Sequence, residues 1–153
     1  MTLEGIDELD QTILYMLQRD ARKTTSNDIA EAAGVSASTV RNRIERLEEN
    51  GILQGYDADV NYEQAGYQLY TLIICSASVR NREELAEAAL NVPGVVRVTE
   101  VMTGENNVHV SVVGNDSDDL SRIGRELDEL GLEVVDEDLI RNEYTCPSDD
   151  FKC

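Results

Sequence analysis

The chain has 153 residues, which is enough for one large domain or two small ones. It carries 31 acidic and 13 basic residues, for a net charge of −18, and 41% of its residues are hydrophobic. No apolar run approaches the length of a membrane span, and the N-terminus lacks a basic region followed by an apolar one. We therefore expect a soluble cytoplasmic protein that does not bind membranes.

The acidic residues are concentrated in the second part of the chain. Residues 1–55 contain six basic and ten acidic residues, whereas the remainder contains seven and 21. Only Lys23 and Lys152 are lysines. This composition is expected of a protein that stays soluble in molar salt, because at about 1 M the Debye length is roughly 3 Å and surface self-repulsion is screened. A disordered acidic protein is the alternative, but periodic apolar patterns run through most of the chain.

A helical pattern opens the chain. Asp7 is placed to cap a helix that runs to about Gln18, with an inward stripe formed by Ile6, Leu9, Ile13 and Leu17. Residues 20–23 then form a turn. Thr25, with Asp28 three residues later, predicts a capping box at the start of a second helix.

The next segment predicts a helix-turn-helix. Gly34 tolerates the positive φ of a sharp turn, and Ser36 is placed to cap the following helix through its hydroxyl. One side of that helix is apolar and consists of Val40, Ile44 and Leu47. Ser38 and Asn42 point nearly opposite, so the helix has a polar outer face that suits the major groove of DNA. A solvated helical hairpin without a DNA-binding role is the alternative.

Residues 52–56 are interpreted as a short strand that forms a small wing, and residues 57–66 as a polar linker. This organisation predicts a winged helix-turn-helix DNA-binding domain over residues 1–56. We expect Asn42 to read a base, and Arg41 and Arg46 to contact phosphates. The full set of candidate DNA-binding residues is Arg22, Lys23, Ser36, Ser38, Thr39, Arg41, Asn42, Arg43 and Arg46.

The pattern changes after the linker. The predicted elements are a strand over 67–79, a helix capped by Asn81 with Glu84, a strand over 95–102, a turn over 103–107, a strand over 108–113, a helix capped by Ser117, and a strand over 132–140. This β-α-β-β-α-β order is that of the ferredoxin-like split βαβ unit, so the fold class is α+β. We assign residues 67–145 to this domain and residues 146–153 to a polar tail.

One face of the predicted sheet is left without helices. It carries Tyr70, Leu72 and Ile74, or the alternate set of the same strand, and in either case it is too apolar to remain in contact with water. The sequence therefore predicts sheet-to-sheet association between subunits.

Metal and catalytic chemistry are disfavoured. Cys75 lies in an apolar strand and is interpreted as a small buried hydrophobe, while Cys146 and Cys153 lie in the tail. Together with the single histidine, His109, they are too few to form a zinc site. The chain offers no nucleophile–base motif and no phosphate-binding glycine loop, so we expect no cofactor and no enzymatic activity. A metabolic enzyme or enzyme-regulating module in the second domain is the alternative from a different functional class.

Together these features resemble the Lrp/AsnC family of transcription regulators, and the composition is that of a member from an extreme halophile of the haloarchaeal type. The resemblance covers residues 9 to about 145. It rests on Leu9-Asp10-x-x-Ile13-Leu14, Asp20-Ala21-Arg22, Asp28-Ile29-Ala30, Gly34-Val35-Ser36, Thr39-Val40-x-x-Arg43-Ile44-x-x-Leu47-Glu48, Gly51-Ile52-Leu53-x-Gly55-Tyr56, Pro93-Gly94-Val95 and Thr103-Gly104.

The resemblance implies a ligand-responsive regulator that binds double-stranded DNA sequence-specifically. Because a dimer presents two recognition helices, we expect its operator to be a pseudo-palindrome. The resemblance also implies a homodimer, formed through the sheets, that stacks into tetramers or octamers. An architectural protein that wraps DNA with little sequence preference is the alternative, but its binding would rest on phosphate neutralisation, which a chain of net charge −18 suits poorly.

By the same resemblance, a small-molecule effector such as an amino acid binds at the turn between the second and third strands, formed by Thr103, Gly104, Glu105, Asn106 and Asn107. This turn usually reads Gly-x-x-Asp in the family, and its carboxylate suits an ammonium group. Here Asn107 offers an amide, which attracts a cation less strongly. Glu105 either substitutes for the carboxylate or is a solvated turn residue, and Asn106 and Asn107 are alternatively plain turn formers. We expect a neutral or weakly polar ligand, or none.

Overall fold

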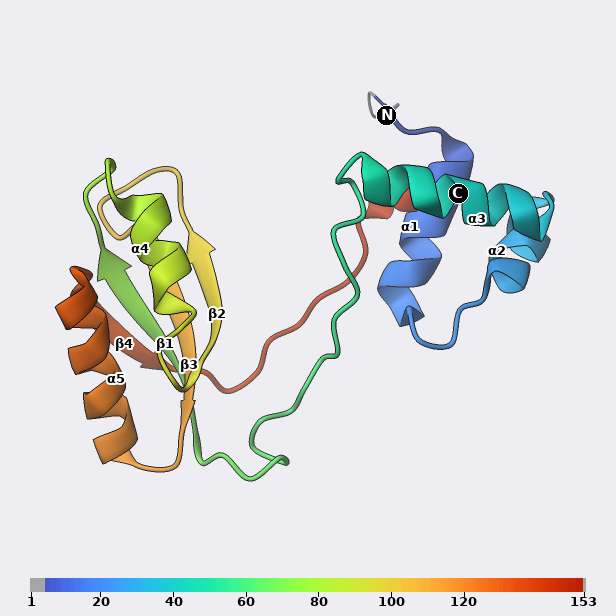
Figure 1. The fold of residues 1–153 in the computed structure, drawn as a ribbon. Coiled ribbons are helices and arrows are strands. Elements are labelled where there is room, and N and C mark those ends of the chain that lie inside the picture. The colour runs from blue at the N-terminus through green and yellow to red at the C-terminus, as the bar shows by residue number, and fades with distance from the viewer. Residues whose placement is uncertain (1–4, 153) are drawn as a thin grey trace. The chain divides into compact units, whose positions relative to one another are not determined.

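The computed structural model describes residues 5–152, so Cys153 of the predicted polar tail lies outside the described residues (Figure 1). The chain divides into two compact units. One contains the described residues up to Ala58 together with those from Tyr144 onward, and the other contains Asp59–Glu143. No helix in the described part of the chain is long and apolar enough to cross a membrane.

Three helices build the first unit, and they are α1 (Glu8–Asp20), α2 (Ser26–Ala33) and α3 (Ala37–Glu49). Each of the three predicted N-caps is confirmed. Asp7 accepts a hydrogen bond from the backbone N–H of Asp10, Thr25 from that of Asp28, and Ser36 from that of Thr39, all through side-chain oxygens (2.9, 3.1 and 3.2 Å). These bonds satisfy N–H groups that the first turn of a helix leaves without partners, so the starts of the helices are encoded locally.

The helices enclose one aliphatic core. The predicted stripes are buried or partly buried, and the core consists of Ile13, Leu14, Leu17, Ile29, Ala30, Val40 and Leu47. Between α2 and α3 the backbone of Gly34 has φ +70°, the left-handed conformation that the turn of a helix-turn-helix requires.

The predicted strand at residues 52–56 does not form. The backbone N–H groups of Ile52 and Leu53 both donate to the carbonyl of Leu47, 3.0 Å away, and so complete the end of α3. A strand also needs a neighbouring strand to accept its hydrogen bonds, and none lies beside this segment among the described residues of the first unit.

The chain end belongs to the first unit. A short 3₁₀ helix, η1 (Asp149–Phe151), contacts α1, and Phe151 packs against the core of the three helices (Figure 1). Phe151 therefore adds to a core whose first residue, Ile13, lies about 140 residues earlier in the sequence.

The second unit is a four-stranded antiparallel sheet with two helices, as predicted. Its elements are β1 (Leu69–Ser76), α4 (Arg82–Ala89), β2 (Val95–Glu100), β3 (Val108–Gly114), α5 (Ser117–Leu130) and β4 (Glu133–Leu139). The strand order β2-β3-β1-β4 is that of the ferredoxin-like fold.

Two predicted caps in this unit are wrong. The residue that caps α5 is Asp116, whose carboxylate accepts from the N–H of Asp119 at 2.9 Å, while Ser117 is already helical. Asn81 precedes α4 in a near-helical conformation (φ −110°, ψ 0°), and its side chain makes no capping bond. A capping residue needs an extended backbone to aim its side chain at the first turn of the helix. Where two polar residues stand side by side, as Asp116 and Ser117 do, the fold decides which of them adopts that backbone conformation.

The sheet has one covered and one open face. Thr71, Ile73 and Cys75 of β1 are buried beneath α4 and α5, which confirms the interpretation of Cys75 as a small core residue (Figure 1). The other set, Tyr70, Leu72 and Ile74, lies on the opposite face and is only partly buried. The structure thus selects between the two sets that the sequence leaves open.

Candidate DNA-binding face and effector turn

The outer face of α3 is polar and accessible. Ser38, Arg41 and Asn42 are exposed, whereas Val40 on the opposite side is fully buried. At the start of the helix, the Ser36 hydroxyl lies 2.8 Å from that of Thr39 and 3.1 Å from that of Ser38. The helix thus presents a cluster of hydroxyls at its positive end, followed by a cation and an amide, and this arrangement suits phosphate and base contacts.

Two further candidate residues lie in the turn between α1 and α2. Arg22 and Lys23 are exposed, and the turn is held by a hydrogen bond from the N–H of Lys23 to the Asp20 carboxylate at 3.0 Å. Neither cationic side chain has an ion pair among the described residues, so both charges are available to a polyanion.

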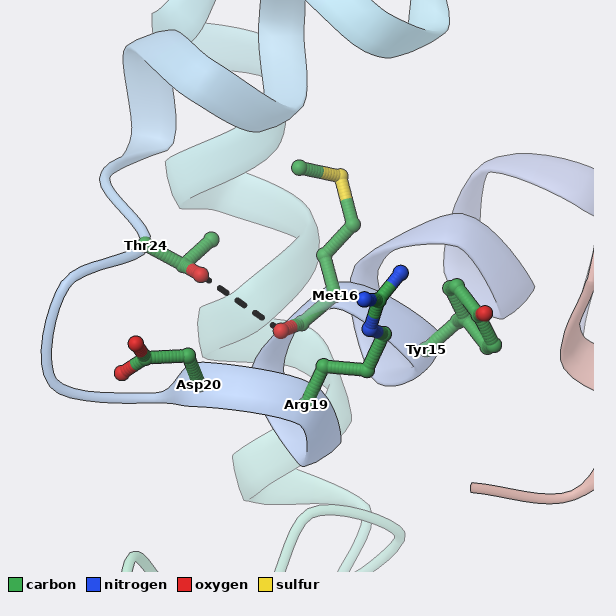
Figure 2. Close-up of a pocket in the computed structure, with 5 residues that line it drawn as sticks. All are labelled: Tyr15, Met16, Arg19, Asp20 and Thr24. Carbon is green, nitrogen blue, oxygen red and sulfur yellow. Dashed lines mark hydrogen bonds between the residues drawn. The ribbon is translucent and has the colours of Figure 1, made fainter. Parts of the chain in front are cut away.

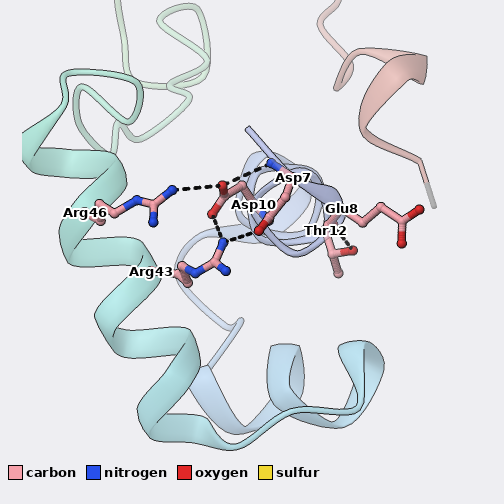
Figure 3. A network of polar contacts seen from close by, with 6 residues as sticks. All are labelled: Asp7, Glu8, Asp10, Thr12, Arg43 and Arg46. Carbon is pink, nitrogen blue, oxygen red and sulfur yellow. Dashed lines mark hydrogen bonds and ion pairs between the residues drawn. The ribbon is translucent and has the colours of Figure 1, made fainter. Parts of the chain in front are cut away.

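Arg43 is held by two carboxylates of the first helix. Figure 3 shows its guanidinium between Asp7 and Asp10, with the Asp10 contact at 3.1 Å, and Arg46 at 4.0 Å from the other oxygen of Asp10. The Asp10 side chain is only 1% exposed, whereas that of Arg46 is 56% exposed. A buried carboxylate needs a cationic partner, so Arg43 serves to fix α3 against α1, while Arg46 remains largely in solvent.

The pKa values of this network follow its geometry. The backbone N–H of Asp10 bonds to the Asp7 carboxylate and, with the adjacent Arg43, lowers the pKa of Asp7 below its ordinary value. The carboxylates of Asp7 and Asp10 raise the pKa of Arg43. The charged forms of both partners are therefore favoured in the folded state.

Asp10 was not among the sequence-based site residues. It interrupts the apolar side of α1 between Leu9 and Ile13, and an acid in that position of a buried stripe requires a partner from elsewhere in the fold. That interruption is the signal that could have found it, although the identity of its partner, 33 residues away, is not encoded locally.

A pocket of about 400 Å³ lies beside the turn between α1 and α2 (Figure 2). The Thr24 hydroxyl donates to the Met16 carbonyl at 3.4 Å, and the Arg19 guanidinium lies over the Tyr15 ring, 5.6 Å from its centre. None of its lining residues belongs to the predicted DNA-binding set or the effector turn, and Thr24 and Arg19 are engaged within the unit itself.

The predicted effector turn connects β2 to β3. Thr103, Glu105 and Asn106 are exposed, and Gly104 has φ +90° with open space around it, so the glycine is required by its backbone conformation. The start of the turn is held by Arg82 of α4, whose guanidinium donates to Glu100 at 2.7 Å and to the Met102 carbonyl at 3.2 Å.

Asn107 differs from the expectation. Asn107 is 2% exposed, and its side-chain amide makes two hydrogen bonds to the backbone of Ala77. Nδ2 donates to the Ala77 carbonyl at 2.8 Å, and Oδ1 accepts from the Ala77 N–H at 2.9 Å. It has no positive φ and is not a plain turn former. Because both polar ends of the amide are used, Asn107 joins the start of β3 to the end of β1 and does not offer its amide to a ligand.

Comparison with known proteins identifies the family. A family model described as winged helix-turn-helix DNA-binding matches residues 6–54. The chain is 35% identical over 118 residues to the HTH-type transcriptional regulator LrpA of Pyrococcus horikoshii, which covers 77% of this chain and 82% of the relative. The chain belongs to the Lrp/AsnC family. This Lrp/AsnC protein is thus a DNA-binding transcription regulator and not an enzyme.

Solved structures share its fold. AsnC of Escherichia coli matches with a TM-score of 0.66 at 23% identity, covering 92% of this chain and 95% of that one. The regulator NMB0573 of Neisseria meningitidis, solved as a complex with L-Met, matches with a TM-score of 0.73 at 24% identity, covering 94% and 95%. These likenesses confirm the predicted arrangement of helix-turn-helix helices followed by a ferredoxin-like domain.

Proposed function

We propose that this Lrp/AsnC regulator binds a pseudo-palindromic operator sequence-specifically as a dimer. The observation that carries the proposal is the exposed polar face of α3, where Ser38 and Asn42 stand opposite a buried aliphatic stripe. In this reading Asn42 contacts a base edge, and Arg41 contacts phosphates. Two recognition helices related by a two-fold axis require half-sites about one helical turn, or a multiple, apart.

The other candidate residues have supporting roles in this proposal. Arg22, Lys23 and Arg46 are exposed cations that add phosphate contacts, and the hydroxyls at the start of α3 accept or donate to the backbone of DNA. Arg43 acts through α3, because its ion pairs with α1 set the position of the recognition helix.

We also propose that the second unit joins subunits and senses a ligand. The open sheet face, with Leu72 and Ile74 partly exposed, forms the dimer, and dimers associate further into tetramers or octamers. A neutral or weakly polar effector binds at the turn formed by residues 103–106. The buried Asn107 holds the end of this turn through its hydrogen bonds to the Ala77 backbone. The L-Met complex of the Neisseria meningitidis relative supports an amino acid as the first ligand to test.

The working environment we propose is a cytoplasm of molar salt. The net charge of −18 and the presence of only two lysines support a halophilic source. In such salt a binding mode that depends on phosphate neutralisation alone is weak, which favours base readout over architectural wrapping.

Footprinting on the promoter regions of the source genome tests the main proposal. We expect a bounded footprint of two half-sites that retains its edges as protein is added. Uniform protection of any DNA sequence would instead support the architectural alternative. Calorimetry with L-Met and a panel of amino acids tests the effector, and the absence of heat for every ligand would refute that part.

A further inference from the structure

The first turn of α1 is closed by two aspartates that cap each other. The backbone N–H of Asp10 donates to one carboxylate oxygen of Asp7 at 2.9 Å, and the backbone N–H of Asp7 donates to one oxygen of Asp10 at 3.2 Å. The second oxygens of the two carboxylates both accept from the same nitrogen, Nη1 of Arg43 (Figure 3). The two aspartates, which we call the acid pair, therefore cap α1 and bind α3 at the same time.

The acid pair adds to a helix whose own charges already cancel. Three arginines and three glutamates lie on α3. Arg43 is bound by both members of the acid pair, and the guanidinium of Arg46 lies 4.0 Å from Asp10. Of the three arginines, only Arg41 has no ion pair among the described residues. Non-specific attraction to DNA comes from cations that neutralise phosphates, so α3 offers less of it than its arginines suggest.

This network lies next to the side of α3 that is proposed to read bases. Residues four positions apart share one side of a helix, so Arg46 lies on the side of Asn42, while Arg43 points to α1. The side chain of Asp7 is 51% exposed, and its hydrogen bonds lower its pKa, so it carries a negative charge at neutral pH. A phosphate that approaches Arg43 therefore meets a cation that already has two carboxylate partners.

We propose that Asp7 and Asp10 determine specificity by keeping Arg43 bound to α1 and away from DNA phosphates. The inference rests on the proposed sequence-specific binding through α3 and names residues that favour the operator over other DNA. On non-specific DNA the side chains contact phosphates alone, so an Arg43 freed from the acid pair adds affinity. On the operator, base contacts require a fixed position of α3, so loosening Arg43 from α1 weakens them. Both effects lower the ratio of operator affinity to non-specific affinity.

The substitution Asp7→Asn tests the acid pair while preserving the cap. Asparagine keeps an oxygen for the N–H of Asp10 and caps helices about as well as aspartate, so the change removes the charge and the bond to Arg43. We expect affinity for random-sequence DNA at about 0.2 M salt to rise at least about threefold, and the slope of log affinity against log salt to steepen by up to about 0.9, the value for one phosphate contact. Operator affinity should rise less or fall. Fluorescence anisotropy with the footprinted operator and a scrambled duplex of the same length, from about 0.2 to 1 M salt, measures both affinities.

A double variant shows whether Arg43 is the cation that is released. Asp7→Asn with Arg43→Gln has the net charge of the parent, and the glutamine amide can still donate to Asp10. Because Arg43 contacts no phosphate in the parent, this variant should return the affinity and salt slope on random-sequence DNA to the parent values. Its operator affinity should nevertheless fall at least about threefold, because the ion pairs that position α3 are lost. A salt slope shallower than that of the parent would mean that Arg43 contacts a phosphate directly, and it would overturn the inference.

A matched control separates the acid pair from net charge. Glu31→Gln makes the same charge change at an exposed position of α2, and Glu31 has no ion pair among residues 5–152. It should leave the ratio of operator to random-sequence affinity unchanged, and circular dichroism checks that every variant is folded. If the parent prefers its operator but Asp7→Asn behaves as Glu31→Gln does, the role of the acid pair is overturned while sequence-specific binding stands. A parent that binds both duplexes alike refutes the proposed sequence specificity itself, and the inference with it.

Discussion

Replacing Asn107 by aspartate changes one atom of a buried amide, and the structure assigns it a large effect on the stability of the second unit. Asn107→Asp keeps an acceptor for the Ala77 N–H but removes the donor to the Ala77 carbonyl, 2.8 Å away. The carbonyl then faces a carboxylate oxygen at a site that is 2% exposed. Both the lost hydrogen bond and the buried charge oppose folding.

The size of the effect can be bounded from both sides. Leaving a buried carbonyl without its partner costs about 1–3 kcal/mol, and burial of the charge adds to this. A protonated carboxyl, however, can donate to the Ala77 carbonyl and restore both bonds. Protonating a carboxyl of ordinary pKa, about 3.9, at pH 7 costs about 4 kcal/mol, which sets the upper limit. We therefore expect Asn107→Asp to lower the free energy of unfolding by about 2–4 kcal/mol at neutral pH.

The pH dependence follows from the same argument. The folded state raises the pKa of the introduced carboxyl, so its protonated form is the stabilising one. The penalty is therefore absent below about pH 3.9, the unfolded value, and it appears as pH rises toward and through the raised folded value. Urea unfolding followed by circular dichroism at several pH values measures it.

The neighbouring exposed residue supplies the control. Asn106→Asp makes the same charge change in the turn and should alter stability by no more than about 0.5 kcal/mol. Equal stability of Asn107→Asp and Asn106→Asp at neutral pH would refute the reasoning. An aspartate at this position would match the usual Gly-x-x-Asp turn of the family, but it should not strengthen amino-acid binding, because the new carboxylate would point at Ala77. Calorimetry that shows tighter binding of a free amino acid by this variant would contradict the assignment.

Four further predictions concern single residues. Asn42→Ala should relax base preference at one operator position by about 1–3 kcal/mol, and unchanged binding to every operator variant would contradict it. Arg43→Ala should destabilise the first unit by about 2–3 kcal/mol in thermal unfolding, because it leaves a buried carboxylate with only a distant cation; a variant as stable as the parent would show that the ion pair is unimportant. Phe151→Ala should destabilise the same unit by about 1–2 kcal/mol, whereas Tyr144→Ala, at a site that is 88% exposed, should not; equal effects would refute the packing of the tail. Burial raises the pKa of the Cys75 thiol to about 11, so a thiol reagent at neutral pH should modify the exposed Cys146 of the folded protein but modify Cys75 only after denaturation; rapid modification of Cys75 itself in the folded protein, located by peptide mass mapping, would refute its burial.

Secondary structure was readable from the sequence wherever its cause is local. The caps at Asp7, Thr25 and Ser36 each bond to a residue three positions later, so the participants stand together in the sequence. The apolar spacing of the helices and the strand–turn–strand order of the second unit are likewise local patterns, and they predicted the α+β architecture and the topology of the sheet.

The roles of individual polar residues depended on contacts between distant segments. Arg43 is a candidate DNA-binding residue in the sequence, and its ion pair with Asp10, 33 positions away, forms only because folding brings the two side chains together. Asn107 looks like a turn residue until the sheet places Ala77, 30 positions away, beside its amide. Phe151 stands in a polar tail, and its place in the core of the first unit follows from the return of the chain end to α1. The sequence determined which segments form helices and strands, because those choices depend on neighbours in the chain. Tertiary structure alone decided which polar side chains remain available to DNA or a ligand, because a buried donor or charge takes its partner from whatever segment the packed fold brings within hydrogen-bond distance.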